Sequence, residues 1–409
     1  MSPLKISWKN VWFKPLSSGL NILLIAFGTG ILTILLLASS QIEEKLTNNS
    51  KDIDLVVGAK GSPLQLILSS IYYIDFPTGN IPLKEAHELA RNPFVKRAVP
   101  LALGDNYNGI RIVGTDTSYI HLYGLTLQNG KFWSADLEAT IGHNVAKEQH
   151  LKVGDTFYGA HGLTENKDVH HDHAYTVTGI LAPQGNVTDN LILTNVASVW
   201  KMHEEPHEHE AGEAHDHEHE EAHDHTEKND REITSLLIQY RSPMAVAMFP
   251  RMVNQMTSMQ SASPAMESTR LFSLIGVGVD TLQWFAVLIM LIAAISVFVN
   301  LYNSLKERSY DLAIMRILGA SRTKLFTIVI LEGLLLTFAG TILGILIGHA
   351  TMELIGHYQE STQAKLSGML FLNSELFLLL AGIGIGIFAA VIPAIQAYRS
   401  NISRILAKN

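Results

Sequence analysis

Four long stretches with almost no charge constrain this chain more than any other feature. Three of them, 15–42, 281–305 and 376–398, contain no Asp, Glu, Lys or Arg, and the fourth, 325–350, contains only Glu332. Each stretch is at least as long as the roughly 20 helical residues that cross the hydrocarbon core of a bilayer. The sequence therefore predicts an α-helical membrane protein with four transmembrane helices.

The first apolar stretch also shares features with a secretory signal, because lysines precede it and Ala38, Ser39 and Ser40 follow it. The apolar region of a signal peptide is usually about 7–15 residues, which is shorter than this run. We therefore interpret residues 15–42 as an uncleaved anchor. Residues 1–14 place tryptophans among lysines, a pattern that favours a short amphipathic helix at the membrane interface over a disordered basic tail.

Basic residues are unevenly distributed around the four stretches. Lys and Arg accumulate on the cytoplasmic side of transmembrane helices. The sequence therefore predicts a multi-pass protein of the bacterial inner (cytoplasmic) membrane with cytoplasmic termini and a cytoplasmic connection 306–324. Residues 43–280 and the short loop 351–375 are then extracytoplasmic, and 399–409 forms a cytosolic tail. The basic residues that set this orientation are Lys5, Lys9, Lys14, Lys306, Arg308, Arg316, Arg322, Lys324, Arg399, Arg404 and Lys408.

The net charge of −8 comes from one segment, since residues 203–231 hold 12 acidic and 2 basic residues. No basic face of the kind that binds nucleic acid is evident in the remainder, so nucleic acid is not an expected partner. The chain has no cysteine, which excludes disulfides, thiolate catalysis and cysteine-based zinc sites.

Residues 43–280 are predicted to form one large extracytoplasmic domain. Helix and strand patterns alternate in 52–107 and again in 232–256, which indicates an α/β module in two pieces. Between them, 108–200 is richer in strand and turn signals and reads as a β-rich insertion, followed by a His/Asp/Glu-rich loop, 201–231. Residues 257–263 read as a polar connection, and 264–280 as a stalk helix that leads into the second span.

The segment 299–350 carries the motifs of a known family. Its first span ends at Glu307-Arg308, a short segment ends in Arg316-Ile317-Leu318-Gly319-Ala320-Ser321, and the next span contains Leu331-Glu332. Residues 389–394 (AAVIPA) close the pattern before Tyr398-Arg399. This part resembles the FtsX-like permease domain of MacB, LolC/LolE and FtsX relatives. The outer region resembles the MacB-like periplasmic domain through Gly114-Thr115-Asp116, Asn129-Gly130-Lys131-Phe132-Trp133, Ile141-Gly142, Leu151-Lys152-Val153-Gly154-Asp155 and Val177-Thr178-Gly179-Ile180-Leu181.

The resemblance implies a membrane α-helical fold with a large α+β extracytoplasmic domain. It also implies the permease subunit of a mechanotransmission ABC transporter, in which a separate cytosolic ABC ATPase hydrolyses ATP. The chain contains no G-x-x-x-x-G-K-[ST] phosphate loop, so ATP is expected only through that partner and no catalytic residue is expected here. MacB carries its ATPase at its own N-terminus, so the layout is closer to LolC/LolE and FtsX. A second permease copy or paralogue and an extracytoplasmic protein are further expected partners.

By the same resemblance, the segment from Arg308 to Gly319 is the coupling helix that sits in a groove of the ATPase. The alternative is a simple connecting loop. Leu312, Met315 and Ile317 can offer an apolar face among the charged residues of this segment. The residues expected to couple to the ATPase are Glu307, Arg308, Asp311, Leu312, Met315, Arg316 and Gly319.

Small residues and one acid stand out within the spans. Glycines at such close spacing let membrane helices approach one another, and they favour packing within the chain over a seam between two copies. A charge inside a span is costly and by default marks a functional site. The place of Glu332 in the Leu-Glu motif, near the cytoplasmic end, favours a structural hydrogen-bonding role instead. The glycines are Gly340, Gly344, Gly348, Gly382, Gly384 and Gly386.

A histidine-rich tract lies in the predicted extracytoplasmic loop, with eight histidines and ten carboxylates within residues 203–225. Imidazole and carboxylate groups suit Zn(II) and similar ions, and a low-complexity tract suits capture or sensing better than a tetrahedral structural site. The alternative is a solvated acidic linker. The expected metal ligands are His203, His207, His209, His215, His217, His219, His223 and His225, with a smaller cluster at His170, His171 and His173.

Three functions compete on this sequence. The first is an ABC permease that couples cytosolic ATP hydrolysis to movements of its outer domain, with a link to zinc homeostasis through the histidine tract. The second is an FtsX-like regulatory subunit that activates an extracytoplasmic partner without transport. The third is a metal-uptake accessory protein, which only the histidine tract supports.

Overall fold

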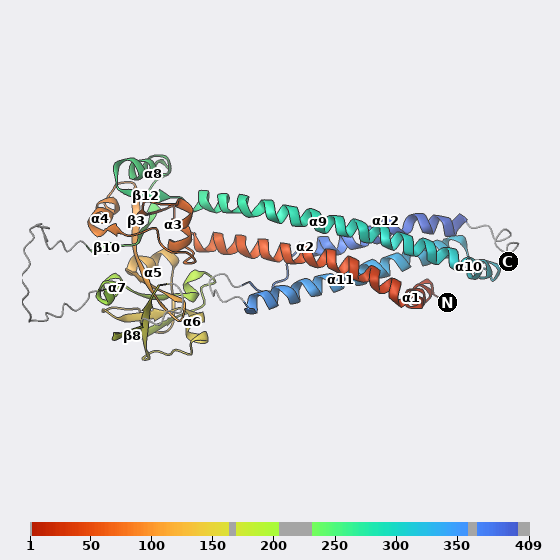
Figure 1. The fold of residues 1–409 in the computed structure, drawn as a ribbon, viewed down its shortest axis with the longest axis horizontal. Helices are drawn as coiled ribbons and strands as arrows, with labels where there is room; N and C mark the ends of the chain where they lie inside the picture. The colour runs from red at the N-terminus through yellow and green to blue at the C-terminus, as the bar shows by residue number, and fades with distance from the viewer. Residues whose placement is uncertain (1, 163–168, 204–230, 359–365, 400–409) are drawn as a thin grey trace, which may run out of the picture. The chain divides into compact units, whose positions relative to one another are not determined.

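The structure is a computed structural model that describes residues 2–162, 169–203, 231–358 and 366–399 (Figure 1). The chain divides into two compact units. The helical unit comprises Met1–Glu43, Ser273–Glu360 and Lys365–Asn409, and the globular unit comprises Glu44–Phe272 and Ser361–Ala364.

Four helices are long and apolar enough to cross a membrane in the described part of the chain, which confirms the predicted spans. They are α2 (Pro15–Asn49), α9 (Pro264–Glu307), α11 (Arg322–Tyr358) and α12 (Glu375–Arg399). The predicted stalk 264–280 and the second span form the single helix α9, because no Pro or charge cluster interrupts the sequence between them. The short helices α1 (Pro3–Phe13) and α10 (Ser309–Ile317) flank α2 and α9.

Glycines let the long helices approach closely, as the sequence predicted. On α11, a Cβ at Gly340 would lie 2.8 Å from Cβ of Ile25, and one at Gly348 would lie 2.7 Å from Cβ of Thr33. A Cβ at Gly344 would overlap the hydroxyl of Thr29. Glycine is therefore required along this face of α11, where α2 takes the space of a side chain.

Helix α12 meets the other side of α11 in the same way. A Cβ at Gly382 or Gly386 would overlap the hydroxyl of Thr341 or Thr337, respectively. Gly384 differs, since a Cβ there meets no atom within 4 Å. Packing within the chain accounts for five of the six glycines. A buried apolar cluster joins the four helices at Ile25, Ala293, Val297, Leu301, Leu336, Ala389 and Ala390.

Residues 367 and 368, which precede α12, are held by side chains of α2 and α11. The amide of Gln41 on α2 donates to the Ser367 carbonyl (2.7 Å) and accepts from the Ser367 N–H (2.8 Å). His349 on α11 lies 2.6 Å from the Gly368 carbonyl and 3.1 Å from a carboxylate oxygen of Glu375 on α12. Helix α11 continues to Tyr358, so it extends into the segment that the sequence analysis predicted as the loop 351–375.

The globular unit is built on a ten-stranded sheet with the order β12-β1-β11-β3-β4-β9-β6-β8-β5, and β7 pairs with β3 and β8. Its strands are β1 (Leu55–Ala59), β3 (Val95–Tyr107), β4 (Ile110–Thr115), β5 (Leu127–Gly130), β6 (Glu138–Ile141), β7 (Thr156–His161), β8 (Val169–Leu181), β9 (Ile192–Asn195), β11 (Ser235–Tyr240) and β12 (Met259–Ala262). A second, two-stranded sheet pairs β2 (Ile81–Pro82) with β10 (Glu232–Ile233).

The α/β module is the antiparallel part, β12-β1-β11-β3, covered by three helices. Its core contains Leu55, Val57, Leu236, Phe249 and Met259. The polar connection predicted at 257–263 is wrong, because residues 259–262 form the edge strand β12, which pairs with β1. Burial of Met259 and Ala262 outweighs the polar character of the segment. The helices are α3 (Pro63–Ser70), α4 (Leu83–Ala90) and α8 (Met244–Met256).

The β-rich insertion shares a strand with the module rather than hanging from it. Residues 95–101 of β3 pair with β11, and residues 102–107 pair with β4. Two parallel pairs, β4 with β9 and β6 with β8, give the insertion its own core, which includes Ile112, Phe157 and Tyr175. Its helices are α5 (Thr117–Tyr123), α6 (His143–Glu148), the short 3-10 helix η1 (Val187–Asn190) and α7 (Val196–His203).

Candidate functional site

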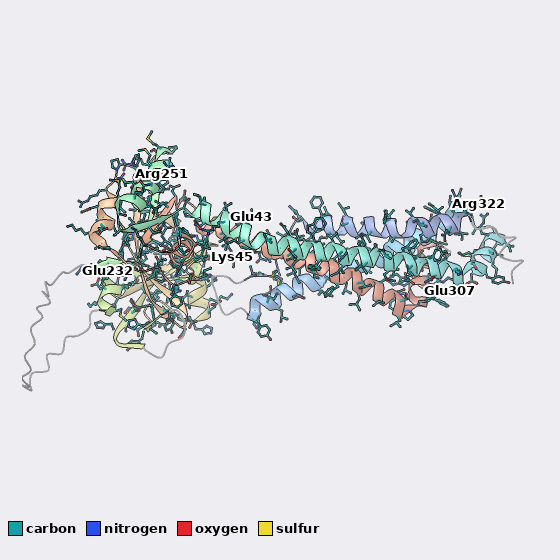
Figure 2. The ribbon with its side chains drawn as sticks, turned by 45° about the horizontal axis from the view of Figure 1, so that its top comes forward. Glu43, Lys45, Glu232, Arg251, Glu307 and Arg322 are labelled. Carbon is teal, nitrogen blue, oxygen red and sulfur yellow. The ribbon has the colours of Figure 1, made fainter. Side chains whose placement is uncertain are left out.

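The predicted coupling segment is a separate helix between two sharp turns. Helix α9 ends at Glu307, and α10 begins one residue after Arg308, whose backbone (φ −95°, ψ 13°) is not helical. Gly319, two residues after the end of α10, has φ +95°, in the left-handed region that glycine adopts readily. Figure 2 labels Glu307, the last residue of α9, and Arg322, the first residue of α11, between which α10 lies.

Arg308 holds the first turn in place. Its guanidinium lies 3.7 Å from a carboxylate oxygen of Glu332 on α11 and donates to the Asn10 carbonyl on α1 (3.1 Å). It also lies 5.3 Å from the ring centroid of Phe13. Asn10 in turn donates to the Glu332 carboxylate (3.4 Å), and Lys14 forms an ion pair with Glu307. These contacts support the structural role predicted for Glu332, since removing one partner of a buried ion pair leaves the other charge uncompensated.

The inner face of α10 packs on the long helices. Leu312 is buried and Met315 is half-buried against a cluster formed by Leu325, Val329, Ala394 and Ala397. Arg316 also serves the fold locally, because it donates to the Ala320 carbonyl (3.0 Å) in the turn after α10. Two of the three apolar residues expected to face the ATPase therefore lie in the core of the helical unit.

The outer face of α10 carries a different set of apolar side chains. Ile314 and Ile317 are 37% and 61% exposed, and Leu318, which directly follows the helix, is 82% exposed. Tyr310 is 45% exposed and precedes the exposed Asp311. We refer to Tyr310, Ile314, Ile317 and Leu318 as the exposed α10 face. The helical spacing of residues 310, 314 and 317 could have revealed this exposed face from the sequence. Leu312 and Met315 on the inner face are spaced in the same helical way, so spacing alone does not say which face is exposed.

A second group of residues joins the ends of two long helices inside the globular unit. The hydroxyl of Tyr72, just after α3, donates to the Leu46 carbonyl near the end of α2 (3.1 Å). The same hydroxyl lies 3.1 Å from the Ser268 hydroxyl in the first turns of α9. One phenol oxygen thus touches both helices.

Asn49, the last residue of α2, is bound to the β-rich insertion. Its carbonyl accepts from the Tyr123 hydroxyl of α5 (3.1 Å), and its side-chain oxygen accepts from the Val187 N–H of η1 (2.8 Å). Burial raises the pKa of Tyr123, so its hydroxyl stays protonated as a donor. We call Tyr72, Asn49, Tyr123 and Ser268 the stalk joint.

The backbone beside Tyr72 is strained and firmly supported. Tyr73 has φ +56°, a conformation that costs on the order of 1–3 kcal/mol outside glycine. Its buried hydroxyl lies 3.1 Å from the Tyr119 hydroxyl. Arg111 donates to the carbonyls of Tyr73 (3.4 Å) and Asp75 (3.2 Å). Burial lowers the pKa of Arg111 to about 10, against the opposing charge of Asp75, so the guanidinium stays protonated at neutral pH. Sequence reasoning missed this group, because its members lie in unremarkable local patterns.

The predicted metal ligands are largely outside the described residues. His207, His209, His215, His217, His219, His223 and His225 all lie in 204–230. His203 ends α7, and His170 and His171 belong to β8, but only their backbone is described. His173, also in β8, joins no group of three metal-ligating side chains within the described residues.

Two family matches cover most of the chain. Residues 284–402 match the FtsX-like permease C-terminal domain. Residues 18–249, more than half of the chain, match the MacB-like periplasmic core domain. The chain therefore belongs to the FtsX-like permeases of ABC transporters that carry a MacB-like extracytoplasmic domain. The matched permease domain is non-catalytic, and an ABC transporter permease implies an ATPase partner.

Two solved structures are similar to parts of this chain. The periplasmic region of MacB from Actinobacillus actinomycetemcomitans is 9% identical, with a TM-score of 0.34 over 56% of this chain and 97% of that one. The extracellular domain of the ABC-type transporter YknZ from Gram-positive bacteria is 11% identical, with a TM-score of 0.31 over 52% and 99%. No curated protein matches.

Proposed function

We propose that this permease passes movements produced by a cytosolic ATPase to its extracytoplasmic domain through α9. The observation that carries the proposal is the position of two sites on this one helix. Ser268 of the stalk joint lies in the first turns of α9. The last residue of α9, Glu307, leads into the turn at Arg308 that precedes α10. Helix α9 is continuous and has no Pro after its first residue, so it keeps its backbone hydrogen bonds and resists bending when one end is displaced.

In this proposal the ATPase binds the exposed α10 face, with Asp311 as its charged neighbour. The Arg308–Glu332 pair transfers displacement of the turn to α1 and α11 instead of letting α10 swing freely. A second permease, identical or paralogous, completes the transporter, and an extracytoplasmic protein receives the movement. If that protein is activated and nothing is transported, the subunit is regulatory, as in FtsX. Reconstitution with candidate partners from adjacent genes separates the two functions, because only transport moves a substrate.

We expect both termini to be cytoplasmic, because the Lys and Arg residues that flank the spans occur at the two termini and in 306–324. Alkaline phosphatase fused after Gly109, in the turn between β3 and β4, should be active, because this enzyme folds only outside the cytoplasm. A fluorescent protein fused after Arg322 should be fluorescent, because this position is expected in the cytoplasm. Alkaline phosphatase and a fluorescent protein, compared at both positions, check the result. Two fusions reporting the same compartment would contradict the orientation.

We also propose that residues 203–225 capture zinc outside the membrane, which the sequence of the tract motivates. Zinc affinity of the full chain should fall as the pH drops through about 6.5, because protons compete for the imidazole nitrogens. Replacing the eight histidines of the tract with asparagine should remove most of the binding measured by calorimetry. The protein should remain folded, because residues 204–225 contain no large apolar side chain.

Growth of cells carrying the asparagine variant, at limiting and at excess zinc, then tests the physiological role. A zinc-dependent growth defect is expected if the tract serves metal homeostasis. Loss of zinc binding with unchanged growth at both extremes would reduce the tract to an incidental chelator, and the transporter proposal would be unaffected.

A further inference from the structure

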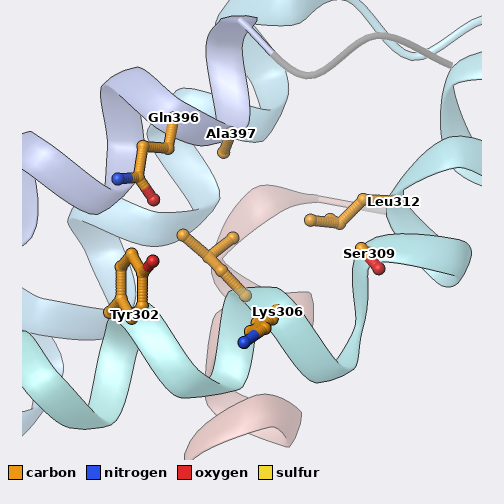
Figure 3. A pocket seen from close by; sticks show the side chains of 7 residues that line it. Tyr302, Lys306, Ser309, Leu312, Gln396 and Ala397 are labelled. Carbon is orange, nitrogen blue, oxygen red and sulfur yellow. The ribbon is translucent and has the colours of Figure 1, made fainter. Parts of the chain in front are cut away.

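A cavity of about 240 Å³ opens beside the turn at Arg308 that joins α9 and α10, and the end of α12 also lines it (Figure 3). Leu305, Leu312 and Ala397 give it an apolar lining. The remaining lining residues are polar: Tyr302, Lys306, Ser309 and Gln396. Within the described residues, none of these four side chains has a hydrogen-bond or ion-pair partner, so their polar groups are available to a ligand.

The surroundings of the cavity place it at the level of lipid headgroups. Helix α1 exposes Trp8 (55%), Trp12 (64%) and Phe13 (72%), the aromatic side chains that prefer the membrane interface. Its continuation is tied to the cavity wall, because Lys14 forms an ion pair with Glu307, the residue after Lys306. An interfacial α1 therefore holds Lys306 at the interface as well.

The chemistry of the lining fits an anionic headgroup. A phosphodiester needs a cation and hydrogen-bond donors, which Lys306 and the hydroxyl and amide groups beside it supply. The apolar part of the lining suits the glycerol and first acyl carbons of a lipid. Basic pockets between transmembrane helices bind such headgroups in other membrane proteins. We propose that this cavity binds the phosphate headgroup of an anionic phospholipid.

Native mass spectrometry of the full chain in detergent, titrated with phosphatidylglycerol or phosphatidylcholine, tests the proposal. Wild-type protein should retain phosphatidylglycerol in preference to phosphatidylcholine. Lys306→Gln should weaken phosphatidylglycerol binding about fivefold, the value for one basic residue at an anionic membrane surface. Lys9→Gln is the matched control, because it removes an equal charge from an exposed position of α1 that does not line the cavity.

Equal effects of the two substitutions would overturn the proposal, since general surface charge would then explain the preference. Displacement of the lipid by inorganic phosphate would also overturn it and assign the cavity to a free anion. A third contrary result is unchanged lipid retention in Lys306→Gln together with weaker ATPase binding, which would make the cavity part of the ATPase interface. Lipid binding requires only that the permease is inserted in a membrane. Its measurement on the permease alone is therefore independent of the proposed coupling to ATP hydrolysis.

Discussion

Replacing Ile314 and Ile317 with aspartate should abolish co-purification of the ATPase subunit while leaving the permease folded in the membrane. Both side chains belong to the exposed α10 face, and neither belongs to the buried apolar clusters of the helical unit. Burial of one such side chain in an interface is worth up to about 1.5–3 kcal/mol, and an unpaired buried carboxylate adds a further cost. Affinity should fall on the order of 100-fold or more.

Pull-down of the ATPase and ATPase activity in detergent or nanodiscs measure this effect. Thr323→Asp is a control for added negative charge, because it places a carboxylate at an exposed position just beyond α10. Leu312→Asp should behave differently and lower the yield of folded permease, because Leu312 is buried against α11 and α12. Normal co-purification of the Ile314→Asp/Ile317→Asp variant would contradict the assignment of this face to the ATPase.

Removing the hydroxyl of Tyr72 and the amide of Asn49 should separate ATP hydrolysis from movement of the globular unit. Tyr72→Phe loses the contacts to Leu46 and Ser268, and Asn49→Leu leaves the Val187 N–H without its partner. Each lost hydrogen bond costs about 0.5–1.5 kcal/mol, and a buried unsatisfied group costs about 1–3 kcal/mol. ATPase activity of the assembled transporter should persist, because α10 is untouched.

Spin labels at introduced cysteines measure the movement, since the chain has no cysteine of its own. Arg251→Cys and Arg322→Cys place one exposed label in each unit (Figure 2). The nucleotide-dependent change in the distance between the labels should shrink by more than half in the double variant. Tyr72→Phe alone, which keeps the Asn49 contacts, should give an intermediate loss. Tyr240→Phe, in β11, is the control, because its ring packs on Phe249 instead of the stalk helices. A full distance change in the double variant would rule out the stalk joint as the connection.

Much of the helical unit could be predicted, whereas the faces of its helices could not. Long stretches with almost no charge identified the four spans, and glycine spacing indicated the contacts of Gly340, Gly344 and Gly348. The sequence did not separate the two faces of α10, because apolar residues occur on both sides of this helix. Leu312 and Ile317 look alike in the sequence, but only Leu312 has Leu325 and Ala397 as neighbours.

The sequence by itself determined that this chain enters a membrane, where its spans lie and which family it resembles. Those properties depend on hydropathy, charge and motifs that are local in the chain. Only the tertiary structure decided that Asn10 meets Glu332, 322 residues away, and that the hydroxyl of Tyr72 bridges α2 and α9. Partners so distant leave no periodic signal, because the chain path between them, and not their own neighbours, brings them together.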